Sequence, residues 1–508
     1  MLEIERKYEA DDETVVPDLS RVTGVESVTD PSEFVLTASY FDTPDHRLAA
    51  WGVTLRRRAG GSDEGWHLKL PSAVEADARH EIGLPLARAK HTVPKPFRST
   101  LAGLVGDQSL VPVATLTTHR TRRGLLDAGG RVLAEIVDDR VDGRTPGGEE
   151  PVSWREIEVE LVEGDEALLD AIETRLMKAG MRPSVRLSKL ELVLGGPHDV
   201  QPLTPTRPRD RVALLISDRL ATQLHELLLR DPLARENLPE GVHAMRVAVR
   251  RLRSALATGR PFLDRSISER LRDELKWLSD ALGEARDAEM QRERLEHAID
   301  ALVEERQDLD WEPALVRPAL LGPLVVRHER AVAELREVLG GDRYAGLLDR
   351  LRAFVAQPPW TAKADKRIRG AYRRRLGHEL HRLQARVETA ADEGLGPEER
   401  NIALHQARKA VKRARYAAEP LRPVYGAPAR RLVKRLKNLQ SRLGEHQDTV
   451  VTREYLHELT RSEDTTLDPK AALVAGALIE RESRDAERYD EESAASWRKV
   501  VVVASVMS

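Results

Sequence analysis

The sequence contains no cysteine, which excludes disulfide bonds, thiolate metal ligands and a cysteine nucleophile. It also lacks an apolar run close to the roughly 20 residues that a membrane-spanning helix needs, the longest candidate being 500–506. Aromatic residues make up only 4% of the chain, which leaves little surface for stacking nucleic-acid bases. Charges begin within residues 1–7, so we expect no signal peptide and a cytoplasmic protein without membrane contact.

The chain is long and strongly charged. Its 508 residues argue for more than one domain, because single hydrophobic cores rarely grow beyond about 250–300 residues. With 41% hydrophobic and 32% charged residues, the composition is typical of a folded protein. Residues 1–200 contain 25 Lys and Arg against 35 Asp and Glu, whereas the remainder contains 56 against 49. The two parts of the chain therefore carry net charges of opposite sign.

The pattern of apolar residues divides the chain into two domains. Residues 1–196 are predicted to be mostly β, with strands at 2–8, 34–41, 53–58, 66–70, 79–84, 132–137 and 155–161 and a helix at 165–179 that stops at Gly180. Residues 197–209 contain four prolines and are predicted to be a linker. Residues 210–508 have a 3.6-residue apolar period, which predicts an all-helical domain with breaks near 232–241, 340–341, 358–359, 394–397 and 465–469.

The helical part contains an internal repeat. Residues 242–253 (VHAMRVAVRRLR) resemble 404–415 (LHQARKAVKRAR), and further downstream Leu282-Gly283-Glu284 aligns with Leu443-Gly444-Glu445. Several matches at a nearly constant offset predict two copies of one helical unit, about 210–355 and 363–495, packed around a pseudo-twofold axis.

Charged residues in the β part recur at alternate positions, which in a strand point to one face. The sets are Glu3, Glu5 and Lys7; Arg56 and Arg58; His67 and Lys69; Arg79 and Glu81; Arg120 and Arg122; and Glu156, Glu158 and Glu160. For any one strand, a solvated face is the simplest explanation. Because six strands share the pattern, the set favours a barrel with a charged interior and an apolar outer face covered by helices and loops.

Such an interior would be lined by many cations: Lys7, Arg56, Arg58, Lys69, Arg120, Arg122 and Lys189. Arg offers forked donors that fit phosphate oxygens, and Lys offers a point charge. Neighbouring carboxylates would repel a phosphate ligand unless metal ions bridge the two, and carboxylate oxygens suit Mg²⁺ or Mn²⁺ rather than zinc. The pattern therefore predicts a site for a phosphate chain and a divalent metal.

An ordered series of motifs in residues 1–196 resembles the CYTH domains, the triphosphate tunnel metalloenzymes. The series is Glu3-x-Glu5-x-Lys7, Tyr40-Phe41-Asp42-Thr43, Leu55-Arg56-Arg57-Arg58, 66–71 (WHLKLP), 156–161 (EIEVEL) and Ser188-Lys189. The resemblance implies an eight-stranded antiparallel β-barrel, or tunnel, with accessory helices. Its members include inorganic triphosphatases, thiamine triphosphatases and adenylate cyclases.

The same resemblance implies a role for each matching residue. Metal ligands would be Glu3, Glu5, Glu158, Glu160 and Asp139; phosphate would be bound by Lys7, Arg56, Arg58, Lys69, Arg120, Arg122 and Lys189; and the catalytic set would be Glu5, Lys7, Lys69 and Arg120. Glu81 is a weaker addition to the metal ligands. Because the phase of the strand is uncertain there, Asp138 could replace Asp139, and Glu135 has the same parity as Asp139.

Two basic stripes stand out in the helical part. His243, Arg246, Arg250 and Arg253 recur at the spacing of His405, Arg408, Lys412 and Arg415, which places each set on one helix face, and Lys276 and Lys437 add a position on the following helix. A solvated face is the ordinary explanation of one stripe, and charges such as 292–296 and 480–492 are interpreted in that way. Two stripes at identical spacing favour a binding surface, because like charges one turn apart repel.

These stripes resemble the CHAD domains, conserved-histidine helical domains, over about residues 210–495. The resemblance implies a helical bundle of two related halves whose basic channel binds inorganic polyphosphate through His243, Arg246, Arg250, Arg253, Lys276, His405, Arg408, Lys412, Arg415 and Lys437. Nucleic acid is the competing ligand for a basic stripe. Few aromatic residues interleave with these cations, which argues against it.

The leading hypothesis is a metal-dependent inorganic triphosphatase joined to a polyphosphate-binding domain, in the cytoplasm and associated with polyphosphate granules. One alternative is a non-catalytic polyphosphate-binding or scaffold protein whose tunnel only binds. The other is an organic triphosphatase or adenylate cyclase, which the absence of a clear adenine or thiazole pocket in the sequence disfavours.

Overall fold

The computed structural model describes residues 2–61, 63–72, 78–86, 92–148, 150–184, 188–196, 211–306, 312–461 and 467–504. The predicted linker, 197–209, lies outside these residues. Contacts divide the chain into two compact units, one comprising Met1–Pro202 with Leu228–Gly241 and the other Leu203–Leu227 with Val242–Ser508. We call them the barrel unit and the helical unit. Among the described residues, no helix has both the length and the apolarity needed to cross a membrane.

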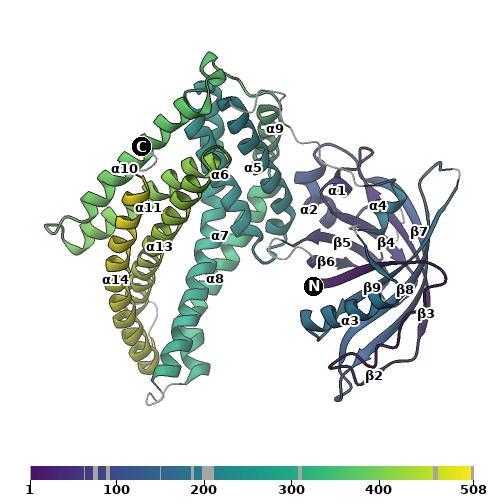
Figure 1. Ribbon diagram of the computed structural model, residues 1–508. Coiled ribbons are helices and arrows are strands. Elements are labelled where there is room, and N and C mark those ends of the chain that lie inside the picture. The colour runs from purple at the N-terminus through teal and green to yellow at the C-terminus, as the bar shows by residue number, and fades with distance from the viewer. Residues whose placement is uncertain are drawn as a thin grey trace. The chain divides into compact units, whose positions relative to one another are not determined.

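Eight antiparallel strands close into a barrel (Figure 1). They are β1 (Leu2–Ala10), β3 (Ser32–Asp42), β4 (Thr54–Ala59), β5 (Gly65–Pro71), β6 (Ala78–Leu84), β7 (Val111–Leu126), β8 (Val132–Arg144) and β9 (Val152–Leu161). Their order is β1-β6-β5-β4-β3-β7-β8-β9, and pairing of β1 with β9 closes the ring. The short strands β2 (Ser27–Val28) and β10 (Arg182–Pro183) pair with β7 and β1. The predicted eight-stranded antiparallel barrel is confirmed.

The apolar core of this unit lies outside the barrel wall. Helix α3 (Glu166–Lys178) buries Leu169, Ile172 and Leu176 against outward-facing residues such as Tyr8 and Ile157. Asp165 caps α3 by accepting a hydrogen bond from the backbone of Leu168, as expected of an N-cap aspartate. The accessory helices α1 (Arg47–Ala50), α2 (Lys95–Val105) and α4 (Lys189–Val193) complete the unit. Covering the outer face leaves the barrel interior to polar residues.

The helical unit consists of long helices joined by short connections (Figure 1). They are α5 (Val212–Arg235), whose residues from Leu228 onward belong to the barrel unit, α6 (Gly241–Gly259), α7 (Arg265–Glu305), α8 (Pro313–Gly340), α9 (Asp342–Ala356), α10 (Ile368–Ala390), α11 (Pro397–Ala418), α13 (Ala427–Arg461) and α14 (Pro469–Ala504), with the short α12 (Arg422–Tyr425) and the 3₁₀ turns η1 (Ala362–Asp365) and η2 (Glu419–Leu421). The predicted breaks fall at or between the ends of these helices, except that Pro232 lies inside α5; residues 465–466 of the last predicted break lie outside the described residues.

The helical repeat is visible in the packing. Helix α7 packs on α8 as α13 packs on α14, and the four helices share one apolar cluster that includes Leu295, Leu320, Leu456 and Leu478. The predicted bundle of two related halves is therefore confirmed, with α6–α8 corresponding to α11, α13 and α14.

Candidate functional site

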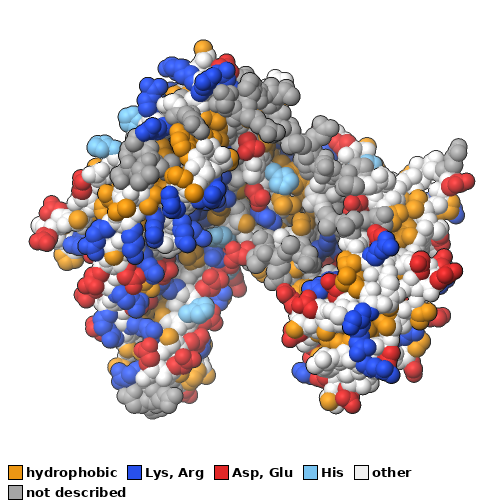
Figure 2. Space-filling model, in the orientation of Figure 1, with side chains coloured by type: hydrophobic (Ala, Val, Ile, Leu, Met, Phe, Trp, Pro, Cys, Tyr) orange, Lys and Arg blue, Asp and Glu red, His pale blue; other side chains and the backbone are white. Residues whose placement is uncertain are grey.

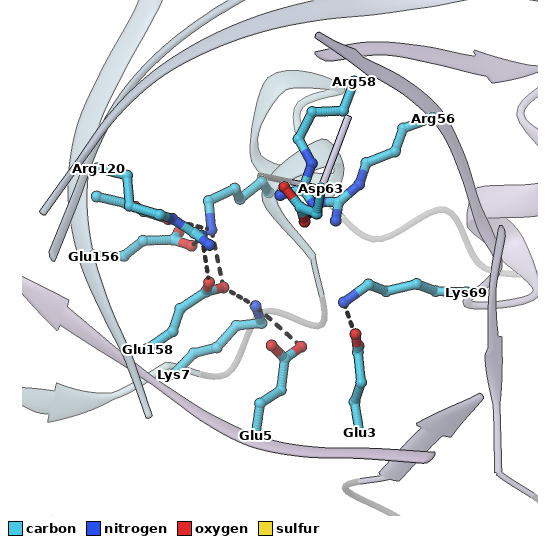
Figure 3. A network of polar contacts seen from close by, with 12 residues as sticks. Glu3, Glu5, Lys7, Arg56, Arg58, Asp63, Lys69, Arg120, Glu156 and Glu158 are labelled. Atoms are coloured by element: carbon cyan, nitrogen blue, oxygen red, sulfur yellow. Dashed lines mark hydrogen bonds and ion pairs between the residues drawn. The ribbon is translucent and has the colours of Figure 1, made fainter. Parts of the chain in front are cut away.

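The barrel interior is lined by opposing charges from several strands. Across the β1–β9 pair, Glu5 lies opposite Glu160 and Lys7 lies opposite Glu158. Figure 3 shows Glu3, Glu5 and Lys7 projecting from β1 toward charged side chains of other strands. The alternating positions noted in the sequence thus converge on one space.

Lys189 and Arg120 neutralise a group of three carboxylates, Asp139, Glu156 and Glu158, on one side of the barrel interior. The Nζ atom of Lys189 lies 3.0 Å from Asp139, 2.6 Å from Glu156 and 2.9 Å from Glu158. Arg120 donates from Nε and Nη2 to the two carboxylate oxygens of Asp139 at 2.8 and 2.6 Å, and from Nη2 to Glu158 at 3.1 Å. Asp139 is completely buried, so its charge depends on these two cations.

A second set of pairs involves strands β1, β4, β5, β6 and β9. Lys69 donates to Glu3 and lies 3.2 Å from Glu81, and the latter also contacts His67. Arg56 lies 3.9 Å from Glu81. Lys7 donates to Glu158 and lies 3.2 Å from Glu5. Cations and carboxylates therefore alternate around the interior.

Burial and neighbouring charge shift the pKa values of these groups. Burial opposes ionisation of Glu158, but Lys189, Lys7 and Arg120 outweigh it and hold the pKa of this carboxyl well below its usual range. Burial lowers the pKa of Lys189, but the carboxylates of Glu156, Glu158 and Asp139 outweigh it and raise this pKa well above its usual range. Burial and a hydrogen bond with Glu81 raise the pKa of Glu3 to about 8.

Most of the predicted tunnel residues line one cavity of about 150 Å³. Its lining includes Glu3, Glu5, Lys7, Arg56, Arg58, Lys69, Arg120, Glu158, Glu160 and Lys189. Asp139 stands behind them in contact with Arg120 and Lys189, whereas Asp138 pairs with Arg155. The structure therefore places Asp139, and not Asp138, at the site.

Arg122 does not join the predicted set. It is absent from the cavity lining, its guanidinium lies 5.2 Å from the centre of the Phe34 ring, and its nearest carboxylate is Glu135 at 3.6 Å. Arg122 follows Arg120 at the same parity, but two residues along a strand separate them by about 6.6 Å. Same-face position therefore did not bring Arg122 into the cavity.

The carboxylates fit a hard divalent cation. Oxygens of Asp139, Glu156 and Glu158 lie within 4.8 Å of one another, around the Nζ atom of Lys189, so a metal ion bound there would have to displace that ammonium. Glu160 forms no ion pair within the part of the chain that the structure describes, and burial together with the charges of Glu5 and Glu158 raises the pKa of its carboxyl. Carboxylate oxygens are the ligands that Mg²⁺ and Mn²⁺ prefer. The sequence-based set of ligands omitted Glu156, although its parity with Glu158 could have indicated it.

A second candidate site is a cavity of about 800 Å³ in the helical unit. It is lined from α6, α7, α8, α11 and α13, and it brings together both basic stripes through His243, Arg246, Arg250, His405, Arg408 and Lys412. Figure 2 shows Lys and Arg side chains gathered on the visible face of this unit. The lining also includes Arg286, Arg294, His297 and Arg327, which the sequence did not single out.

The last member of each stripe and the two lysines lie elsewhere. Arg253, Arg415, Lys276 and Lys437 are absent from the cavity lining. The exposed Lys276 pairs with Asp280 at 3.0 Å, and Arg415 stacks on the Tyr416 ring at 4.7 Å. Ten residues of helix span about 15 Å, so a stripe of this length extends past the cavity.

Several cavity cations already have carboxylate partners. Arg246 lies 2.7 Å from Asp287, and Arg408 lies 3.8 Å from Asp448. The two halves of the repeat therefore have an equivalent ion pair at equivalent positions. Arg294 pairs with the buried Glu482 at 2.7 Å, which shows that the interpretation of 292–296 and 480–492 as solvated faces was wrong at these two residues. No carboxylate of the described residues lies within ion-pairing distance of Arg250 or Lys412.

The electrostatic environment of Lys412 is unfavourable for its charge. Burial and the charges of Arg408, Arg250 and Arg246 lower the pKa of Lys412 to about 7, against the smaller effect of Asp448. Burial likewise lowers the pKa of the neighbouring His405, whose Nδ1 lies 2.8 Å from the Gln447 side-chain oxygen. The cavity therefore concentrates positive charge that its own carboxylates do not balance.

Lys412→Met should raise the Tm of the helical unit at pH 6. The folded-state pKa of Lys412 lies below its unfolded value, so the lysine charge lowers the free energy of unfolding. This destabilisation is at its full size below about pH 7, where the side chain is charged in both states, and it is gone above about pH 10.5, where it is neutral in both. Calorimetry should show a gain of about 2–4 °C per kcal/mol recovered, shrinking as the pH rises toward 10. Lys409→Met, at an exposed position of the same cavity, is the control. Equal Tm changes in both variants would mean that the destabilisation does not come from the buried charge of Lys412.

Comparison with known proteins matches each unit to a domain family. Residues 1–182 match the CYTH domain family and residues 218–457 match the CHAD domain family. Uncharacterized protein Rv2226 of Mycobacterium tuberculosis (strain ATCC 25618 / H37Rv) is 35% identical over 522 residues, which cover 98% of this chain and 96% of that protein.

Two solved structures resemble the chain over a little more than half its length. PptA from Streptomyces chartreusis is 23% identical, with a TM-score of 0.48, and covers 57% of this chain and 99% of its own. The CHAD domain from the plant Ricinus communis is 24% identical, with a TM-score of 0.42, and covers 59% of this chain and 96% of its own.

Proposed function

The chain belongs to the CYTH–CHAD proteins, and from this premise we propose that its barrel hydrolyses inorganic triphosphate with Mg²⁺ or Mn²⁺ while its helical unit binds inorganic polyphosphate. The observation that carries the first half is the cavity in which Arg56, Arg58, Lys69 and Arg120 face the carboxylates of β1 and β9. Cations bind phosphate oxygens, and carboxylates bind the metal that a polyphosphate ligand requires.

The size of the tunnel cavity supports an inorganic substrate. Its volume of about 150 Å³ lies below the roughly 300–1,000 Å³ of pockets that hold drug-sized ligands. The buried Nε groups of Arg56 and Arg58 donate to no acceptor among the described residues, so an incoming phosphate oxygen would satisfy them. These features favour a compact phosphate chain over a nucleotide held entirely within the cavity.

The chemistry assigned to the tunnel is transfer of a terminal phosphoryl group to water. When bound, the divalent ion neutralises phosphate charge and lowers the pKa of water. The cations of β4, β5 and β7 hold the phosphate chain and stabilise the charge that develops on the transferred group in a buried, low-dielectric space. Water oxygen bonds to the terminal phosphorus, pyrophosphate leaves, and a carboxylate of β1 or β9 takes the proton of the attacking water.

The second half of the proposal concerns the helical cavity. Arg250 and Lys412 have no carboxylate partner among the described residues, and the cavity is large enough to accommodate several phosphates of a chain. A polyanion would supply the missing counter-charge along both stripes. Association with polyphosphate granules in the cytoplasm would follow from this binding.

One observation favours an organic triphosphate as the second candidate substrate. A cavity of about 470 Å³ adjoins the tunnel cavity, shares Lys7 and Ser188 with it, and has Trp154 and Glu156 in its own lining. An organic group could occupy this larger space while its phosphates reach the cations. A non-catalytic tunnel that only binds polyphosphate remains the alternative of a different class.

The deciding experiment is orthophosphate release from inorganic triphosphate, ATP, thiamine triphosphate and long-chain polyphosphate, with Mg²⁺, Mn²⁺ or EDTA. We expect metal-dependent release that is fastest from inorganic triphosphate. Faster release from an organic triphosphate would favour the adjoining cavity, and pyrophosphate formation from ATP would indicate a cyclase. No release together with retained polyphosphate binding would make the protein a receptor.

A further inference from the structure

Arg58 differs from the other tunnel cations in the carboxylate that it contacts. Lys7, Lys69, Arg120 and Lys189 pair with carboxylates that project from barrel strands. Arg58 instead donates from Nη2 to Asp63, which lies in the connection between β4 and β5. Figure 3 shows the Asp63 carboxylate beside the ends of Arg58 and Arg56, inside the group of cations.

The two partners differ sharply in exposure. The Arg58 side chain is 7% exposed, whereas that of Asp63 is 53% exposed. Asp63 also lines the tunnel cavity, so its carboxylate occupies space next to a cation assigned to phosphate. An exposed carboxylate can withdraw into water at little cost, whereas the buried guanidinium cannot follow it.

Arg58 requires an anion at this position. Burial and the charges of Arg56 and Arg120 lower the pKa of Arg58 to about 10, although Asp63 works against this shift. The backbone of Asp63 is held separately, because its carbonyl oxygen lies 2.9 Å from Nε2 of His67. The side chain can therefore leave Arg58 while the connection stays anchored.

We propose that Asp63 is an internal competitor that occupies Arg58 in the free protein and is displaced by a phosphate group of the substrate. This inference rests on the proposed binding of inorganic triphosphate in the tunnel. It makes Asp63 a determinant of substrate affinity, because every triphosphate that binds must first break the Asp63–Arg58 pair. Orthophosphate carries less negative charge than triphosphate, so it competes less well with Asp63 for Arg58. The return of Asp63 to Arg58 also favours release of the product.

The test compares Asp63→Asn with Glu64→Gln, which removes one negative charge at the adjacent exposed position. Titration calorimetry with inorganic triphosphate is run with Ca²⁺ as well as in EDTA, because the lining carboxylates are expected to need a bridging metal, and initial rates with Mg²⁺ separate KM from kcat. Asp63→Asn should tighten binding and lower KM by about fivefold, the scale of a partly exposed ion pair, with kcat changed less than about twofold. Glu64→Gln should leave both constants near the wild-type values.

A double-mutant cycle with Arg58→Gln isolates the pair. In the Arg58→Gln background, the gain from Asp63→Asn should disappear. If the wild type binds triphosphate but Asp63→Asn does not bind it more tightly, the competitor role is wrong and the proposed function stands. If the wild type neither binds nor hydrolyses triphosphate, the proposed function fails and the competitor role fails with it.

Discussion

Glu5→Gln should reduce metal-dependent orthophosphate release from inorganic triphosphate by about 100-fold or more, with the barrel still folded. Glu5 lines the tunnel cavity and lies directly across the β1–β9 pair from Glu160, a like-charged neighbour. Burial and the charge of Glu5 raise the pKa of the Glu160 carboxyl, which forms no ion pair among the described residues, so the repulsion between the two is not fully balanced on the Glu160 side. A bound cation would relieve that repulsion, so we expect this pair to hold the metal.

The stability of the variant separates this role from a structural one. Burial opposes ionisation of Glu5, but the charge of Lys7 outweighs it and lowers the pKa of this carboxyl, so ionised Glu5 stabilises the fold at neutral pH. Glu5→Gln should lower the Tm by only a few degrees because Lys7 keeps its contact with Glu158. Glu33→Gln, on an exposed position of β3, removes the same charge and should leave turnover unchanged. A fully active Glu5→Gln enzyme, or one whose loss follows a collapse in Tm, would remove Glu5 from the metal site.

The sequence predicted the barrel interior better than it predicted the connections. Strand parity placed Glu3, Glu5 and Lys7 on one face, and the structure directs that face inward. Parity could not choose between Asp138 and Asp139, because the choice depends on the register that sets Asp139 opposite Arg120. Asp63 has no periodic neighbours, so no pattern could have indicated that a residue between two strands reaches Arg58.

In the helical unit, periodicity predicted the faces of helices but not the extent of the cavity. The stripes on α6 and α11 were recognised because their cations recur at helical spacing. Arg294 was missed because it shares no stripe with them; only the packing of α7 against its neighbours brings it to the cavity and to Glu482. A single helix shows which residues share a side, whereas tertiary contacts decide which of them surround one space.

The second large effect is expected in polyphosphate binding. Charge reversal of both Arg250 and Lys412 to Glu should weaken the affinity of the full-length chain for long-chain polyphosphate by about 100-fold. Each charged contact contributes about 1.5 kcal/mol, and the loss of two gives that factor. Each cation that contacts phosphate also releases counterions on binding, so the slope of log Kd against log salt should fall by about two.

A matched reversal of Arg330 and Arg484 tests whether position or net charge matters. These side chains are 81% and 71% exposed on α8 and α14, outside the cavity lining, and their reversal changes the net charge by the same amount. If binding depends on the cavity, this control should keep both the affinity and most of the salt slope. Equal weakening by both pairs would mean that polyphosphate responds to the overall charge of the chain. Burial and neighbouring cations lower the pKa of both Arg250 and Lys412, so neither charge stabilises the free fold; the Tm of the doubly reversed chain should stay near the wild-type value, which calorimetry checks before the loss of affinity is assigned to the cavity.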